Sequence, residues 1–431
     1  MNWSQQEAKM KQQSLERFDM SAPPMHTAWY LRPLTHLLSA PDVLLHRTKI
    51  KKTRMEGLKP PYLLLCNHNA FFDFKVAMMA IYPHCANPIV AIDGFIGREW
   101  LLRKVGCICK RKFTSDMMLV KQIMQVIQNG DICMIYPEAR YSLCGTTAVL
   151  PASLGSLCKL LKVPVVTLIC HGHHIDSPFW NLHKRGVKPT EAEMTVLFTP
   201  EELAAASKEE VNKRIVSAFQ YDDYAWQKAR GIRVTYKKRA EGLEKVLYQC
   251  RHCGTEYRMA SEGTALFCRA CGKRWEYTEL GELQAENGEA VHIPDWYEWE
   301  RANVKKEVEA GTYDSGELPV TVRSLPNAKR FILLGEGYLR HSMDGFTVRG
   351  TDGDGDPFEM MKTVPSLYSC HIEYEYLGKY GDCVDLNTLE DTWYIYPHDC
   401  DFAVTKMALA TEELYQKWCR DAGRPKGPGL A

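Results

Sequence analysis

A histidine and an aspartate stand five residues apart in the segment 67–73, NHNAFFD. The segment follows the apolar run 62–66, which predicts a buried strand, and open α/β sheets place their chemistry at the carboxyl ends of such strands. A carboxylate that accepts a hydrogen bond from one imidazole nitrogen makes the other nitrogen a better base toward a hydroxyl. The spacing makes His68 a candidate general base and Asp73 its orienting partner. On spacing alone, a histidine that caps the next helix also fits.

Two further segments carry charged side chains beside apolar strands. Residues 106–112, GCICKRK, bring together Lys110, Arg111 and Lys112, and residues 136–142, YPEARYS, contain Glu138 and Arg140. Phosphate binding requires fixed cations, and the planar fork of arginine suits a phosphate. A solvated loop also explains the three cations, and a surface carboxylate at a strand end also explains the glutamate.

The order of these segments resembles the glycerolipid acyltransferase family, which includes the glycerol-3-phosphate and 1-acylglycerol-3-phosphate acyltransferases. That family carries N-H-x4-D, a glycine-to-arginine block, F-P-E-G-T-R, and a V-P-[IV]-[IV]-P strand, for which this chain has VPVVT at 163–167. The resemblance spans about 61–172. It implies that His68 deprotonates an acceptor hydroxyl, which attacks an acyl thioester directly, and that Asp73 orients His68. It also implies acceptor-binding roles for these side chains: Asn67, Lys110, Arg111, Lys112, Glu138 and Arg140.

The chain departs from the family pattern in the third and fourth blocks. Ala139 stands where the family has glycine, and Tyr141 stands where it has arginine, with Arg140 one place early. Thr167 replaces the second proline of the fourth block. These departures leave the predicted general base in place and alter the predicted acceptor pocket.

Four cysteines form two C-x2-C-G units, Cys250 with Cys253 and Cys268 with Cys271, separated by 14 residues. Glycine after the second cysteine permits the tight turn that aims two thiolates at one point. Four thiolates predict a tetrahedral structural zinc site that is closed to substrate. Aromatic and basic residues around it also occur in nucleic-acid binders. The simpler interpretation is a small unit that needs the metal to fold and acts as a spacer or docking surface.

Three histidines, His171, His173 and His174, end the apolar strand predicted at 163–169. They could form a second metal site, but the one carboxylate near them in the sequence is Asp176. Because they end a buried strand and no other carboxylate lies near, we interpret the three as a polar strand end.

The surrounding pattern predicts the fold. Apolar runs at 62–66, 88–92, 132–136 and 163–169 alternate with helical spacing, as at 117–128, which indicates an α/β sheet covered on both faces. Beyond about 282 the pattern is that of several strands and a closing helix, hence an α+β domain whose element order is somewhat like a pleckstrin-homology fold. We expect four regions: an N-terminal interfacial segment at 1–60, an acyltransferase domain at 61–225, a zinc ribbon at 226–282 and the strand-rich domain at 283–431.

Charge and composition indicate where in the cell the protein acts and what kind of partner it binds. The 431 residues carry 54 Lys+Arg and 53 Asp+Glu, but residues 1–240 carry 33 and 20, a net of +13, which leaves −12 for the rest. A basic N-terminal half suggests an anionic partner such as a phosphate group or a lipid surface. No apolar run reaches about 18 residues, so no membrane-spanning helix is expected. Residues 1–20 lack the features of a secretory signal, and isolated cysteines in apolar runs fit a reducing cytosol.

The sequence therefore predicts a cytoplasmic acyltransferase, peripheral on the inner face of a membrane. It would move a fatty acyl group from acyl-CoA or acyl carrier protein to a lysophosphatidate-type hydroxyl. Structural zinc is the expected cofactor, and nucleic acid is not an expected partner. The alternative is a catalytically silent scaffold of the same fold that docks a partner through the ribbon and the C-terminal domain. The altered third block motivates this alternative, while the intact His68 and Asp73 oppose it.

Overall fold

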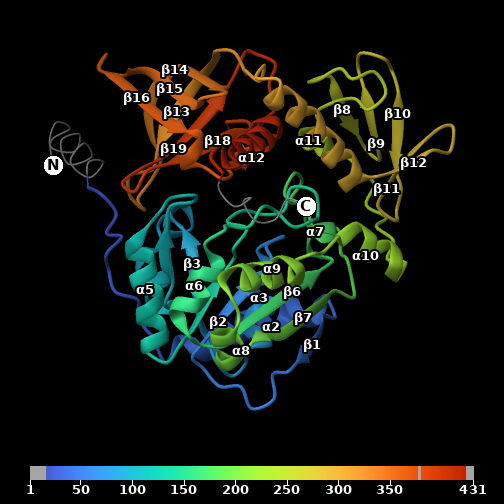
Figure 1. Cartoon of the computed structure of the whole chain (residues 1–431). Helices are drawn as coiled ribbons and strands as arrows, with labels where there is room; N and C mark the ends of the chain where they lie inside the picture. Colours follow the sequence, from blue (N-terminus) through green and yellow to red (C-terminus); the bar gives the residue numbers. More distant parts are fainter. Residues whose placement is uncertain (1–15, 377–379, 424–431) are drawn as a thin grey trace, which may run out of the picture.

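The computed structural model describes residues 16–376 and 380–423 and contains two seven-stranded sheets and one five-stranded sheet (Figure 1). The first sheet has the order β1-β7-β6-β2-β5-β3-β4. Its strands are β1 Lys49–Thr53, β2 Tyr62–Cys66, β3 Ala86–Ala91, β4 Ile108–Lys110, β5 Ile132–Ile135, β6 Val165–His171 and β7 Glu191–Phe198. The strands from β6 to β4 in this order pair in parallel, whereas β7 runs antiparallel to β6 and parallel to β1.

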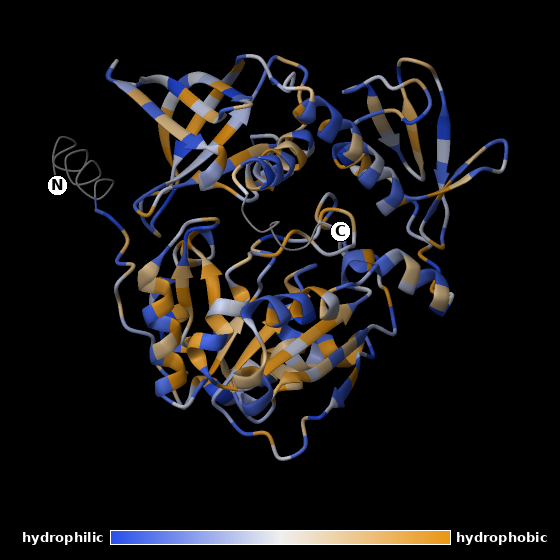
Figure 2. Cartoon of the chain, viewed as in Figure 1, coloured by the Kyte–Doolittle hydropathy of each residue, from blue (hydrophilic) through white to orange (hydrophobic). Residues whose placement is uncertain are grey.

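Helices cover both faces of this sheet, as the continuous apolar runs predict (Figure 1). Because strand side chains alternate between faces, Leu64 of β2 packs with Val76 of α3, while Leu63 and Leu65 pack with Ile123 of α5. Figure 2 shows the resulting apolar strands between helices of mixed polarity. The helices are α2 Leu31–Leu45, α3 Phe72–Ala80, α4 Glu99–Val105, α5 Met117–Gln128, α6 Leu154–Leu161, α7 His173–Asp176, α8 Pro200–Ala205, α9 Lys208–Ala218 and α10 Asp223–Arg230, with the 3-10 turn η1 Ile92–Phe95.

The cysteine-rich region forms the five-stranded antiparallel sheet, in the order β12-β11-β10-β9-β8. Its strands are β8 Met259–Glu262, β9 Ala265–Cys268, β10 Arg274–Tyr277, β11 Glu282–Ala285 and β12 Ala290–His292, and the 3-10 turn η2 Leu243–Lys245 precedes them. The long helix α11, Ile293–Glu309, begins directly after β12. Its fully buried Trp296 packs edge-on against Trp275 of β10, with ring centroids 4.8 Å apart. The sheet therefore extends past the expected limit at 282 and ends at α11.

The C-terminal sheet is antiparallel, in the order β16-β15-β14-β13-β19-β18-β17. Its elements are β13 Leu318–Ser324, β14 Ile332–Ser342, β15 Gly345–Asp352, β16 Pro357–Thr363, η3 Val364–Ser366, β17 His371–Glu373, β18 Cys383–Asn387, β19 Thr392–Pro397 and the final helix α12 Val404–Asp421. Seven strands and a closing helix match the expected strand-rich region. The likeness to a pleckstrin-homology fold still rests on this element order.

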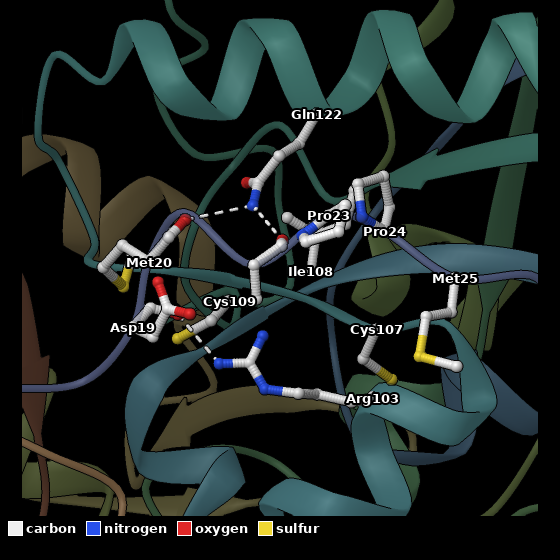
Figure 3. Close-up of a pocket in the computed structure, with 11 residues that line it drawn as sticks. Asp19, Met20, Pro23, Pro24, Met25, Arg103, Cys107, Ile108, Cys109 and Gln122 are labelled. Atoms are coloured by element: carbon white, nitrogen blue, oxygen red, sulfur yellow. Dashed lines mark hydrogen bonds between the residues drawn. The ribbon is translucent and has the colours of Figure 1, made fainter.

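The described part of the N-terminal region, residues 16–60, is joined to the first sheet. β1 lies within the expected interfacial segment 1–60, yet it pairs with β7, with Lys49 opposite Glu191. Further upstream, Gln122 of α5 donates hydrogen bonds to the carbonyls of Met20 and Ala22, at 3.0 and 2.8 Å (Figure 3). Backbone pairing and these side-chain contacts tie the region to the α/β unit.

Candidate active site

His68 and Asp73 meet at the carboxyl end of β2. His68 lies two residues beyond this strand, and Asp73 lies in the first turn of α3. The two atoms His68 Nδ1 and Asp73 Oδ2 are 3.2 Å apart, and the same oxygen accepts hydrogen bonds from the backbone N–H groups of Asn69 and Ala70, at 2.5 and 2.9 Å. The Asp73 side chain is fully buried, while that of His68 is 21% exposed. The buried carboxylate of Asp73 therefore holds the Nδ1 edge of the His68 imidazole, which is partly accessible to solvent.

Burial by itself raises the pKa of Asp73, but hydrogen bonds from His173 and His68 more than offset this and lower the pKa to about 2. Asp73 is thus ionised across the physiological range. Within the described part of the chain, His68 Nε2 has no hydrogen-bond partner. The arrangement leaves that nitrogen available to accept a proton from a bound hydroxyl.

The imidazole ring of His68 lies between two tyrosines of the third block. Its centroid is 4.0 Å from that of Tyr136 and 4.3 Å from that of Tyr141, with interplanar angles of 24° and 39°. Tyr141 stands at the position where the family pattern has arginine. At the position for which the resemblance implies a cation, the Tyr141 ring instead makes a packing contact that restricts how the imidazole of His68 can tilt.

Glu138 holds the backbone of His68. Its Oε1 accepts the His68 N–H at 3.1 Å, and its Oε2 accepts the Ala148 N–H at 2.8 Å. The His68 carbonyl in turn accepts the Ser142 N–H at 2.8 Å. Burial raises the pKa of Glu138 to about 8. The expected acceptor-pocket role of Glu138 stays a prediction, because in the structure both of its oxygens bind backbone amides.

Asn67, predicted to bind substrate, is fully buried and paired with β6. Its Nδ2 donates to the Cys170 carbonyl at 2.9 Å, and its Oδ1 accepts the Cys170 N–H at 2.8 Å. The side chain thus imitates a strand peptide group and extends the β2–β6 pairing. These two hydrogen bonds fix the position of the backbone from which His68 projects.

Arg111, predicted to bind phosphate, is buried with both of its terminal nitrogens engaged by the C-terminal region. Its four acceptors, at 2.8–2.9 Å, are Leu325 O, Pro326 O, Glu390 O and Thr392 Oγ1. This arginine therefore connects the strand β4 to the loops of the C-terminal sheet.

The other predicted cations also have partners. Arg140 donates to Glu412 of α12 at 2.7 Å, and Lys112 contacts His371 of β17, with Nζ 2.8 Å from Nε2. Lys110 donates to the backbone carbonyl of the nearby residue Thr114 at 3.0 Å. Three of the four cations thus bind the C-terminal region, and a phosphate role for them would require these contacts to break.

His173 belongs to the site although the sequence pattern indicated only a polar strand end. Its Nδ1 lies 2.5 Å from Asp73 Oδ1, and both side chains are fully buried. The residues are 100 positions apart, so no local spacing could reveal the pair. In the structure Gly172, directly before His173, has φ +87°, and a Cβ there would come within 2.8 Å of the Trp226 ring.

The four cysteines converge as the two knuckles predict. Cys250 Sγ and Cys271 Sγ are 3.8 Å apart, as are Cys253 Sγ and Cys268 Sγ, and all four sulfurs lie within 4.8 Å of one another. A tetrahedral zinc with bonds of about 2.3 Å separates its sulfurs by about 3.8 Å. The residues present fit a zinc ion.

Comparison with known proteins supports an acyltransferase-like N-terminal region. The family model described as Acyltransferase matches residues 46–171. The crystal structure of the 1-acyl-sn-glycerophosphate (LPA) acyltransferase PlsC from Thermotoga maritima is similar, with 13% identity and a TM-score of 0.35, over 47% of this chain and 80% of that one. Comparison with the curated proteins gives no match. The segment 46–171 contains His68, Asp73 and Glu138 and ends two residues before His173.

Proposed function

We propose that the protein is an O-acyltransferase that moves a fatty acyl group from acyl-CoA or acyl carrier protein to a hydroxyl of a lysophosphatidate-type glycerolipid. The observation that carries the proposal is the pair of His68 and Asp73: Nδ1 faces a buried carboxylate at 3.2 Å, while Nε2 is left without a partner in the described chain. The match of the surrounding residues 46–171 to the acyltransferase family model supports it.

In this reaction His68 Nε2 accepts the proton of the acceptor hydroxyl while the hydroxyl oxygen attacks the thioester carbonyl carbon. The tetrahedral intermediate then expels the thiolate, which takes the proton back from the imidazolium, so that the products are an ester and a free thiol. The Asp73 carboxylate, whose pKa is lowered to about 2, stabilises the imidazolium between the two steps. A positioned base of this kind contributes about 10²–10⁴-fold to the rate.

The outward surface of α2 supports attachment to a membrane. Leu37 and Leu44 are 68% and 75% exposed, and Trp29 just before the helix is 81% exposed, whereas His36 and Ser39 are buried. A surface helix ordinarily turns its apolar side inward, so an outward apolar side marks an interaction surface. No described helix has both the length and the apolar character needed to span a bilayer. We propose a peripheral association in which α2 lies in the interface.

Basic strand residues beside α2 favour an anionic lipid surface. Lys49, Lys51 and Lys52 of β1 are all exposed, and this strand follows α2 directly. Each lysine close to an anionic bilayer contributes about 1 kcal/mol of attraction. The inner leaflet of a cell membrane, reached from the cytoplasm, has this charge, and we propose it as the location.

The protein partners of two predicted phosphate-binding cations favour one alternative function. Because Arg111 and Arg140 bind the C-terminal region, the acceptor-phosphate pocket of the family is altered, as a catalytically silent scaffold would allow. In that case the ribbon and the C-terminal region would dock a partner. The scaffold has no use for an exposed imidazole that is oriented by a buried carboxylate, so we prefer the enzyme.

The test is an assay of acyl transfer to lysophosphatidate, with acyl-CoA and acyl carrier protein thioesters as donors. We expect His68→Ala to lose about 10²–10⁴-fold in kcat. The exposed His84 provides a control, since His84→Ala should keep full activity. Equal turnover by the wild type and His68→Ala would exclude the proposed base. Consumption of no thioester across the donors, with lipid binding intact, would support the scaffold.

A further inference from the structure

Asp73 divides its two oxygens between two histidines. Oδ2 accepts from His68 Nδ1 at 3.2 Å and from two backbone amides, whereas Oδ1 faces His173 Nδ1 at 2.5 Å. Among the described residues, His173 is the donor that reaches Oδ1. Because the carboxylate is fully buried, an oxygen without a donor there would be left unsatisfied away from water, which is unfavourable.

His173 is itself held in place by the elements around it. It begins the short helix α7 after the left-handed turn at Gly172, and the carboxylate of Asp223 accepts the backbone N–H groups of Gly172 and His174, each at 3.1 Å. The Phe72 ring packs on the other side, with its centroid 4.6 Å from that of the His173 ring. The imidazole therefore approaches Asp73 from a fixed direction.

The far nitrogen of His173 has no use that the structure shows. Nε2 is buried and has no hydrogen-bond partner within the described residues. An apolar side chain at position 173 could fill the same space without burying an unpaired nitrogen, which is unfavourable. The contact with Asp73 is thus the polar interaction that accounts for a histidine at position 173.

We propose that His173 is a positioning residue for acyl transfer. It holds Oδ1 of Asp73 so that Oδ2 stays aimed at His68 Nδ1, and it keeps the carboxylate ionised when the imidazolium forms. The inference rests on the proposed function. The hydrogen bonds from His173 and His68 both lower the pKa of Asp73 against the effect of burial, which agrees with this role.

A metal ion is the competing explanation, because Asp73, Cys170 and His173 place ligand atoms within 4.8 Å of one another. An ion bound to both Asp73 and His173 through bonds of about 2.0–2.2 Å would keep their ligand atoms roughly 3.3 Å apart in a tetrahedral site. The observed separation of 2.5 Å is too short for two ligands of one such ion and is that of a short hydrogen bond. We therefore assign the contact to a proton and not to a metal.

Three variants test the assignment in the full-length protein. His173→Asn keeps a donor close to the position of Nδ1, while His173→Leu, of similar size, removes it. We expect His173→Leu to lower kcat about 10–100-fold with both KM values within twofold of the wild type, and His173→Asn to recover most of the loss. The adjacent buried His174, which makes no contact with Asp73, supplies the control His174→Leu.

Several outcomes would overturn the proposal. They are an unchanged kcat in His173→Leu, an equal loss in His174→Leu, or a second bound metal that is lost with His173→Leu. If the leucine variant does not fold, His173→Gln replaces it, because its amide nitrogen falls near the Nε2 position; equal activity of the asparagine and glutamine variants then overturns the proposal. A wild type without His68-dependent turnover removes the proposed function and this role together, whereas an active His173→Leu beside an inactive His68→Ala removes this role alone.

Discussion

Glu412 of α12 accepts a hydrogen bond from Arg140 at 2.7 Å, and this pair ties the last helix of the chain to the loop that supports His68. The second oxygen of Glu412 accepts from Arg301 of α11, also at 2.7 Å. Burial raises the pKa of Glu412, but the two guanidinium groups outweigh burial and lower it. The loop that supports His68 is therefore braced by a carboxylate more than 270 residues away from Arg140 in the sequence.

Removal of the Glu412 carboxylate should lower both the stability and the activity of the protein. Glu412→Gln leaves Arg140 and Arg301 buried without their shared counter-charge, which should lower the free energy of unfolding by about 3–5 kcal/mol. Urea denaturation measures this change. Glu359→Gln, on the exposed surface of β16, is the control and should change it by less than about 0.5 kcal/mol. Equal stability of the two variants would show that the pair does not brace the loop.

The acid dependence of stability should reveal Asp73. Its folded pKa of about 2 lies below the ordinary 3.8, so its ionised form contributes about 2 kcal/mol above pH 3.8, and this contribution is lost as the pH falls toward 2. Asp73→Asn should be less stable than the wild type at pH 7, and the gap should narrow between pH 4 and 2. Urea titrations at several pH values measure the gap, and a constant gap would contradict the assignment.

The same carboxylate bears on catalysis in acid. Because Asp73 stays ionised to about pH 2, its own protonation cannot cause a fall in kcat at mildly acidic pH. We expect Asp73→Asn to lower kcat about 10²-fold at all pH values, and Asp73→Glu, which keeps a carboxylate, to lose less. Initial-rate pH profiles of both variants measure this. A profile of Asp73→Asn that coincides with the wild type would exclude an orienting role.

Zinc should be bound at one ion per chain and should hold the ribbon. Elemental analysis should find this stoichiometry in the wild type and a loss of zinc in Cys253→Ser and Cys271→Ser, while Cys400→Ser, outside the cluster, keeps it. Because Trp296 Nε1 of α11 donates to the Gln249 carbonyl beside the first knuckle at 3.0 Å, chelation should also loosen α11. Unchanged folding after complete chelation would exclude a structural role for the metal.

The apolar side of α2 should bind anionic vesicles. The double variant Leu37→Glu with Leu38→Glu should weaken binding to phosphatidylglycerol vesicles at least tenfold, because both leucines are exposed and a carboxylate is repelled from the interface. The matched control is Leu333→Glu with Leu389→Glu, two exposed leucines of the C-terminal region. Vesicle sedimentation measures binding, and equal loss in both double variants would refute a specific role for α2.

The catalytic sheet could be predicted because its signals are local. The continuous apolar runs at 62–66 and 132–136 became β2 and β5, and the helical period at 117–128 became α5. β1 was missed because it is basic and exposed, so no apolar pattern indicates a strand. It forms because β7 offers it a parallel edge.

The site could be predicted only in part, for the same reason. His68 and Asp73 were found because the pair is short in sequence and ends a recognisable strand. The contacts of Arg111 and Arg140 were not foreseen, since their acceptors lie 214 to 281 residues away. Cations beside a motif indicate that they bind an anion or an acceptor group. Tertiary packing decides whether that partner is a substrate or another part of the chain.

Arg111 and Arg140 bind residues of the C-terminal region, and these contacts limit where the chain can be cut into fragments. A fragment that stops after the ribbon would retain every motif of the family yet expose two arginines to water and release the turn behind Glu138. Proteolytic removal of the chain beyond the ribbon should therefore lower any acyl transfer although the residues that resemble the family motifs all remain. Expression of the acyltransferase-like region by itself is expected to yield an aggregation-prone product.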